Sequence, residues 1–243
     1  MPLWSPDDGI RRVLVVTAHP DDVDFGSAGT VAAFTGAGVE VTYCIVTNGE
    51  AGGSDRAMTR KDMAALRQDE QRAAAAVVGV SEVRFLGHPD GMVESTPGLR
   101  RDISRVIREV RPERVVTQSP DRNWDFIYAS HPDHLATGEA AVSAVYPDSR
   151  NPFAHPELLE AEGLEPWTVP ELWLMGPGDR AGIAVDTTAT VERKVAALLC
   201  HKSQIPDPDG VSTRIRDWAR AAGESAGLGG GASAELFRVI RIP

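Results

Sequence analysis

One segment near the start of the chain joins an apolar run to a cluster of polar residues. Residues 13–16 (Val-Leu-Val-Val) are rich in β-branched side chains and lack polar alternation, which is typical of a strand buried on both faces. The run is followed by His19, Pro20, Asp21 and Asp22. Because open α/β sheets bind ligands at the carboxyl ends of their strands, this segment predicts a functional site directly after the first strand.

The remainder of the chain alternates between strand and helix patterns. Further strands are predicted at 39–46, 83–86, 114–117, 172–175, 182–185 and 237–242. Helices are predicted at 24–35, 60–78, 98–110, 132–145 and 212–226, and before Cys200, where Asp186, Thr187 and Thr188 are expected to cap the helix. Strands that alternate with helices predict an α/β fold, with a mostly parallel sheet and helices on both faces.

The chain is expected to form a single domain over residues 1–243. Its 42% hydrophobic content is ordinary for a globular protein, and no internal repeat or linker divides it. The segment 147–170 is rich in Pro, Glu and Asn, and we expect it to form a surface insert. Cys44 and Cys200 lie in apolar segments and are expected to be buried thiols rather than a disulfide.

The charge of the chain argues against two classes of partner. With 25 basic and 35 acidic residues the formal net charge is −10, so neither nucleic acid nor an anionic membrane is an expected partner. No apolar run approaches the ~20 residues of a membrane span. Residues 1–8 are acidic and lack the apolar core of a signal peptide, so a cytoplasmic protein is expected.

A second polar cluster, His131-Pro132-Asp133-His134, lies at the predicted start of a helix. Proline and an acidic residue both favour a helix N-terminus. His131 and His134 are three residues apart, a spacing that places both side chains on one helical face. Asp22 likewise follows His19 by three residues, so each cluster offers two potential ligands from one short segment.

Together the two clusters contain what a catalytic metal site requires. Two imidazoles and one carboxylate, with a position left open to water, form a typical catalytic zinc site, and imidazole also suits Fe2+ or Co2+. Such a metal polarises a carbonyl and activates water. Asp21 can face that water as a base without binding the metal, and the remaining histidine can act as a donor. A turn and a solvated helix cap would explain either cluster alone but explain the pair poorly.

The ordered set of motifs resembles the PIG-L/LmbE family of zinc-dependent N-deacetylases, which includes the deacetylases of mycothiol and bacillithiol synthesis. The resemblance includes both clusters and the segments 47–50, 67–70, 90–92 and 194–204. It implies a Rossmann-like α/β fold and hydrolysis of an N-acyl group, most often acetyl, from a small amino sugar or amino-sugar conjugate. Relatives are often homo-oligomers, so a homo-oligomer is compatible with the resemblance.

Carried over by position, the resemblance implies three zinc ligands: His19, Asp22 and His134. Asp21 is then the general base. His131 is the cationic acid that protonates the leaving amine and stabilises the tetrahedral intermediate.

The resemblance also implies supporting roles. Asp133 orients an active-site histidine, and Arg67 and Asp90 match positions that contact sugar hydroxyls in relatives. The chain departs from the mycothiol-pathway enzyme at one place. That enzyme has a tyrosine two residues before the first histidine of the second cluster, whereas this chain has Ala129 there and Tyr128 one place earlier.

Two other functions are compatible with a metal site. A metal-dependent phosphoester hydrolase would need cations to hold phosphate, yet acidic residues flank both clusters. A non-catalytic relative that only binds metal or sugar could lose Asp21 and still bind. The presence of Asp21 in this chain therefore favours an enzyme.

Several side chains near these motifs keep two interpretations. Arg67 and Glu70 could form a surface ion pair or contact the substrate. His88 is expected to be solvated rather than a ligand. The aromatic residues before His131 could stack on a sugar or simply pack their loop; they are Trp124, Phe126 and Tyr128.

Overall fold

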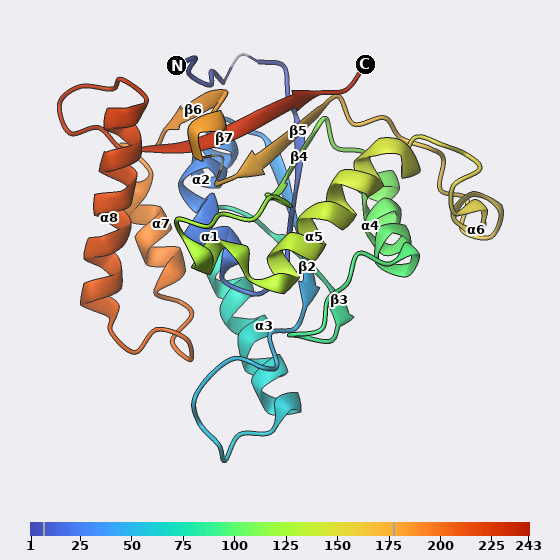
Figure 1. Ribbon diagram of the computed structural model, residues 1–243, viewed down its shortest axis with the longest axis horizontal. Helices are drawn as coiled ribbons and strands as arrows, with labels where there is room; N and C mark the ends of the chain where they lie inside the picture. Colours follow the sequence, from blue (N-terminus) through green and yellow to red (C-terminus); the bar gives the residue numbers. More distant parts are fainter. Residues whose placement is uncertain (7, 177) are drawn as a thin grey trace.

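The computed structural model describes residues 1–6, 8–176 and 178–243. Its strands are β1 (Arg12–Thr17), β2 (Glu40–Thr47), β3 (Glu82–His88), β4 (Arg114–Gln118), β5 (Glu171–Met175), β6 (Ile183–Asp186) and β7 (Ala234–Arg241). They form one sheet in the order β3-β2-β1-β4-β5-β7-β6 (Figure 1). The strands from β3 to β5 pair in parallel, and β7 runs antiparallel to both β5 and β6. The predicted mostly parallel α/β sheet is confirmed.

Helices cover both faces of the sheet (Figure 1). They are α1 (Asp22–Gly26), α2 (Ala28–Gly36), α3 (Arg60–Val77), α4 (Pro97–Val110), α5 (Pro132–Ser143), α6 (Pro156–Glu160), α7 (Val191–Leu198) and α8 (Pro208–Ser225). Val13 and Val15 of β1 join the core beneath α2 and α3, whereas Leu14 and Val16 join the core beneath α4 and α5. Successive strand residues point to opposite faces, which explains why the run at 13–16 is apolar throughout. Within the described residues, no helix is long and apolar enough to cross a membrane.

The order of the strands creates a crevice between β1 and β4. The chain steps from β1 to β2 and β3 on one side, and then returns through α4 to place β4 on the other side of β1. The loops that follow β1 and β4 therefore diverge at the carboxyl edge of the sheet, where open α/β sheets bind ligands. The Ala18 N–H donates to the Gln118 side-chain oxygen at 2.9 Å and ties the two strand ends together.

The predicted helix at 24–35 is two helices, with the break at Ser27. A distant carboxylate explains where the second helix begins. Glu235 of β7 accepts hydrogen bonds from the N–H groups of Gly29 (3.1 Å) and Thr30 (2.7 Å), so it satisfies free donors in the first turn of α2. A cap supplied from more than 200 residues away has no local sequence signal.

Some predicted boundaries are wrong. The cap predicted at Asp186–Thr188 does not form, because α7 begins at Val191 with Thr190 as its N-cap residue. Helix α8 begins at Pro208 rather than at the predicted residue 212. Its N-cap residue is Asp207, whose side chain accepts a hydrogen bond from the Gly210 N–H. Cys44 is buried as expected, but Cys200 is only half-buried; neither is in a disulfide in the described part of the chain.

The insert at 147–170 contains α6 and is anchored to the domain by Arg108 of α4. This arginine is only 2% exposed, and its guanidinium donates to five backbone carbonyls of the insert: Asp148, Ser149, Asn151, Ala154 and Leu164. Because those carbonyls are then satisfied inside the protein, the insert packs as part of the structure rather than as a free loop.

We expect Arg108→Met to lower the free energy of unfolding by about 2–4 kcal/mol, because it leaves several buried carbonyls without a donor. Urea unfolding monitored by circular dichroism measures the loss. The matched control is Arg216→Met, which removes an exposed pair with Glu192 and should cost ~1 kcal/mol or less. Equal losses in the two variants would contradict the anchoring role of Arg108.

Candidate functional site

A cleft of about 1200 Å³ opens at the carboxyl ends of β1 and β4. The loop after β1 contributes His19 to its lining, the loop after β3 contributes Asp90, and the segment after β4 contributes residues from Gln118 to His134. The cleft therefore lies at the crevice that the strand order creates. Both predicted clusters, though more than 100 residues apart in the chain, meet in it.

The three predicted zinc ligands lie at the corners of a small triangle. His19 Nδ1 is 3.2 Å from His134 Nε2 and 3.3 Å from Asp22 Oδ2, and His134 Nε2 is 3.0 Å from Asp22 Oδ1. Around a tetrahedral zinc ion with bonds of about 2.0–2.1 Å, donor atoms are separated by roughly 3.3 Å. The spacing and chemistry of these three side chains fit such an ion.

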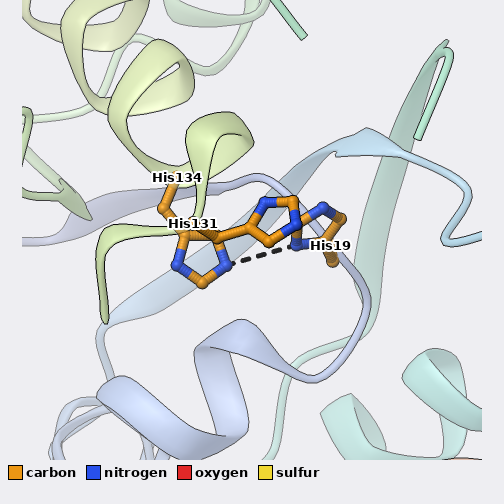
Figure 2. Close-up of side chains that lie close together, drawn as sticks. All are labelled: His19, His131 and His134. Atoms are coloured by element: carbon orange, nitrogen blue, oxygen red, sulfur yellow. Dashed lines mark hydrogen bonds between the residues drawn. The ribbon is translucent and has the colours of Figure 1, made fainter. Parts of the chain in front are cut away.

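Two further groupings surround the same histidine. A ring nitrogen of His131 lies within 4.8 Å of those of His19 and His134, and Figure 2 shows the three imidazoles gathered together. His19, Asp90 and Asp133 form a second group within the same limit. Geometry alone thus brings more potential ligands together than a tetrahedral site uses.

The contacts of His19 Nε2 indicate which of these groups of side chains could bind a metal. His19 Nε2 lies 3.1 Å from Asp133 Oδ2 and 3.2 Å from Asp90 Oδ1. Asp133 is fixed in turn by the N–H groups of Gly91 (2.8 Å) and Val93 (3.3 Å). A metal-binding histidine usually donates its second N–H to a carboxylate, so in this arrangement Nδ1, which faces Asp22 and His134, is the nitrogen that could bind a metal.

Local structure explains how both clusters point into the cleft. After β1 the chain turns sharply at Asp21, whose φ of 92° lies in the left-handed region that few non-glycine residues adopt. The turn starts α1 at Asp22, and the His19 N–H donates to the Asp22 carboxylate at 2.7 Å. In the second cluster His131 is the N-cap residue of α5, and His134 follows in the first turn.

Opposite charges dominate the electrostatics of the triangle. Burial alone would lower the pKa of His19, but the carboxylates of Asp22, Asp133 and Asp90 raise it to about 12. Burial would raise the pKa of Asp22, yet the charges of His134 and His19 hold it well below its usual range. Without a metal, a proton on His19 therefore supplies the positive charge that the carboxylates require.

Asp21 lies beside the triangle and is held by α3. Burial raises the pKa of Asp21 to about 6, against the opposing charge of Arg67. One guanidinium nitrogen of Arg67 donates to Asp21 Oδ2 (3.1 Å) and to the Pro20 carbonyl (2.6 Å), and the other donates to the Gly49 carbonyl (2.9 Å). A Cβ at Gly49 would lie only 2.6 Å from that guanidinium, so glycine permits this approach.

A buried relay behind Asp21 was not predicted from the sequence. Gln71, one helical turn after Arg67, accepts from the Asp21 N–H (2.8 Å) and donates to Asp24 Oδ2 (3.0 Å). The same oxygen of Asp24 lies 2.8 Å from His201 Nε2, and all three side chains of the relay are fully buried. The only sequence signal was the one-turn spacing of residues 67 and 71. Through the hydrogen bond between the Asp21 N–H and Gln71, the relay stabilises the strained backbone of Asp21.

Other predicted residues have varied outcomes. Arg67 and Glu70 do not form a surface ion pair, since both are buried and Glu70 accepts from the N–H and hydroxyl of Ser203. His88 lies 3.2 Å from Asp102 and is not among the described residues that line the cleft.

The loop before His131 contributes two of its three aromatic side chains to the cleft. Phe126 and Tyr128 line it, whereas Trp124, which is 79% exposed, is not among the described lining residues. Tyr128 is 82% exposed, and Ala129 also lines the cleft. His131 Nδ1 accepts from the Asp133 N–H at 3.2 Å.

Comparison with known proteins identifies a family whose profile covers both clusters. A sequence profile described as "PIG-L: GlcNAc-PI de-N-acetylase" matches residues 14–145, a stretch that contains both clusters. The chain is 29% identical to diacetylchitobiose deacetylase of Thermococcus kodakarensis, over 84% of this chain and 73% of the relative. It is 31% identical to a probable N-acetyl-alpha-D-glucosaminyl L-malate deacetylase 2 of Bacillus cereus, over 80% of this chain and 84% of the relative.

A solved structure extends the similarity to the whole fold. The N,N'-diacetylchitobiose deacetylase of Pyrococcus horikoshii, in complex with an inhibitor, matches this protein with a TM-score of 0.89 and 29% identity. The match covers 99% of this chain and 88% of that one.

We expect metal binding at neutral pH to release protons. A ligand must be deprotonated to bind, and His19, with a pKa of about 12 in the metal-free protein, carries a proton at pH 7. Zinc affinity should therefore rise with pH, about tenfold per unit for each proton displaced. Calorimetric titrations in buffers of different ionisation enthalpy measure the number released. Burial and the charge of His19 lower the pKa of His131, so His131→Ala should leave that number unchanged. Zinc binding without proton release would contradict a protonated His19.

Proposed function

Because the chain belongs to the PIG-L family of de-N-acetylases, we propose that it is a metal-dependent hydrolase that removes the N-acetyl group from an amino sugar or amino-sugar conjugate. One observation carries the proposal. The His19–Asp22–His134 triangle has the dimensions of a tetrahedral metal site, and the unliganded carboxylate of Asp21 lies next to it.

The proposed metal is zinc, held by His19 Nδ1, Asp22 and His134 Nε2, although the same donors suit Fe2+ or Co2+. When bound, such an ion polarises the amide carbonyl and lowers the pKa of water toward neutrality. Asp133 would orient His19 and fix its tautomer through Nε2, a contact of 3.1 Å.

Asp21 is the proposed general base. With a pKa raised to about 6, its carboxylate is ionised at neutral pH and still basic enough to take a proton from the attacking water. Arg67 and Gln71 hold its side chain and backbone in place, which fixes the direction in which the proton moves. The oxygen of that water then bonds to the carbonyl carbon, and the carbonyl oxygen gains negative charge.

His131 is the proposed acid and oxyanion donor. The Asp133 N–H donates to its Nδ1, so the neutral ring carries its proton on Nε2, where it can hydrogen-bond to the oxyanion. Burial and the charge of His19 lower the pKa of His131, so the ring would hold a second proton only briefly: it would take up the proton that Asp21 removed from the water and give it to the departing amine. The carbon–nitrogen bond breaks, and acetate and the free amine are the products.

Arg67 and Asp90 line the cleft as proposed contacts for sugar hydroxyls. Each also supports the reacting groups: Arg67 holds Asp21, and Asp90 lies 3.2 Å from His19 Nε2. The pairing of Arg67 and Lys194, two of the three Arg and Lys residues in the described cleft lining, with the carboxylates of Asp21 and Glu235 disfavours the phosphoester alternative.

We expect Asp21→Asn to bind zinc as the wild type does but to lose about 10²–10⁴-fold in kcat, since the amide cannot accept the proton of water. The measurement is amine release from a panel of N-acetylated sugars, with chelator-treated protein and after zinc is returned. Asp121→Asn, which changes a cleft carboxylate paired with Arg180, is the matched control and should keep most of its activity. A fully active Asp21→Asn would contradict the assignment of the base, and bound zinc without amine release from the whole panel would contradict the proposed substrate.

Alanine variants of His131 and His134 distinguish between the alternative groups of metal ligands that the geometry leaves open. We expect His134→Ala to lower zinc affinity strongly, since it removes one of three protein ligands. His131→Ala should keep its zinc and lose turnover instead. Metal content after dialysis against a weak chelator, measured by atomic absorption, provides the comparison. Loss of zinc in His131→Ala with retention in His134→Ala would reverse the two assignments.

A further inference from the structure

A fully buried histidine, His201, lies close to the proposed site without reaching the cleft. It follows α7, is 0% exposed and is not among the described residues that line the cleft. Its ring is therefore out of reach of a bound sugar, and the proposed reaction gives it no role. Successive side-chain contacts nevertheless join it to the proposed base, Asp21, through Asp24 and Gln71.

The first of these contacts gives a donor to a buried carboxylate. His201 Nε2 lies 2.8 Å from Asp24 Oδ2, and the same oxygen accepts from Gln71 Nε2 at 3.0 Å. The other oxygen of Asp24 is buried and has no hydrogen-bond partner within the described chain. Because a buried carboxylate is costly unless it is hydrogen-bonded, the position of Asp24 depends on these two donors. Without His201, the amide of Gln71 would have to hold it unaided.

The second contact fixes the orientation of the Gln71 amide. Its Oε1 accepts from the Asp21 N–H at 2.8 Å, while its Nε2 donates to Asp24. Turning the amide over would place its NH2 group against the N–H of Asp21 and its oxygen against the carboxylate of Asp24. Asp24 therefore keeps the Gln71 oxygen directed at Asp21, and His201 keeps Asp24 in the place from which it does so.

Asp21 needs this support because its backbone is strained. Its φ of 92° lies where few non-glycine residues are found, and such a conformation persists where its surroundings hold it. The Asp21 carbonyl accepts from the N–H groups of Asp24 (2.9 Å) and Phe25 (3.0 Å). Arg67 holds the carboxylate, whereas Gln71 holds the N–H. Loss of the bond to Gln71 would let the peptide group before Asp21 turn, and the carboxylate of the proposed base would move with it.

We propose that His201 is a positioning residue for deacetylation. Through Asp24 and the Gln71 amide, it holds Asp21 in the conformation that directs its carboxylate at the attacking water. The inference rests on the proposed function and adds to it a residue that touches neither substrate nor metal. The metal ligand Asp22 is held independently, because its carboxylate accepts from a backbone N–H of the preceding loop at 2.7 Å. Loss of His201 should therefore slow the chemical step and leave zinc binding unchanged.

Two substitutions separate the donor of His201 from the bulk of its ring. We expect His201→Leu, which removes the donor, to lower kcat about tenfold or more for the N-acetylated sugar that the wild type hydrolyses fastest, with KM and zinc content little changed. His201→Gln, whose amide can donate to Asp24, should restore most of kcat. The matched control is Ser203→Ala, which removes a hydroxyl bond of 2.6 Å from the same segment to Glu70 of α3 and should keep kcat.

A double variant tests whether the effect passes through the base. In the Asp21→Asn background, His201→Leu should lower the residual kcat by about twofold or less, because the group that it positions is already inactive. A further loss of about tenfold in that background would mean that His201 acts on the fold at large and would overturn the proposal. Equal losses of kcat in His201→Gln and His201→Leu would also overturn it, since the donor would then have no effect.

Hydrogen exchange of the Asp21 amide, followed by NMR on the metal-free protein, tests the contacts without turnover. Relative to the amides of β1, exchange should become about tenfold faster or more in His201→Leu and in Gln71→Met, which breaks the same series of contacts nearer to Asp21 and serves if His201→Leu does not fold. Ser203→Ala should leave it unchanged. Faster exchange supports the positioning role even if the wild type releases no amine from any sugar, a result that would overturn only the proposed function. Unchanged exchange in the folded variants would overturn the positioning role and leave deacetylation intact.

Discussion

The imidazole of His19 fixes the site because both of its nitrogens are in use. Nδ1 faces Asp22 and His134 at 3.2–3.3 Å, and Nε2 faces Asp133 and Asp90 at 3.1–3.2 Å. Asp133 and His134 are neighbours in the chain and contact opposite sides of this ring, so the first turn of α5 can dock in only one way. The rigid ring thereby sets the end of β1, the start of α5 and the loop after β3 relative to one another.

Gathering several carboxylates around His19 is electrostatically unfavourable unless nearby positive charge offsets them. Four carboxylates, those of Asp21, Asp22, Asp90 and Asp133, lie around one ring, and buried like charges disfavour each other. Arg67 offsets one of them, and in the metal-free protein a proton on His19 offsets others. The same arrangement explains the high pKa of His19 and would favour a divalent cation, whereas the raised pKa of Asp21 comes mainly from its burial, with the charge of Asp22 adding to it.

What could be predicted from the sequence is what local spacing determines. The strand at 13–16, the i,i+3 pairs and the start of α5 are short-range features, and family resemblance added the separate roles of Asp21 and Asp133. Contacts between distant segments were missed, including the Glu235 cap of α2, the Gln71–Asp24–His201 relay and the burial of Arg67. Each depends on how helices pack on the sheet, and a lone glutamine or glutamate looks the same whether it is solvated or buried.

The two parts of the cleft differ in how tightly the structure constrains them. Around His19 nearly every polar atom has a partner in the backbone or in a buried side chain, so a substitution there disturbs several contacts at once. Phe126 and Trp218 are half-exposed and contribute surface rather than hydrogen bonds, so their replacement is expected to leave the fold intact. The end of the cleft at His19 is therefore fixed by many contacts, whereas its aromatic wall could vary without disturbing the proposed metal site.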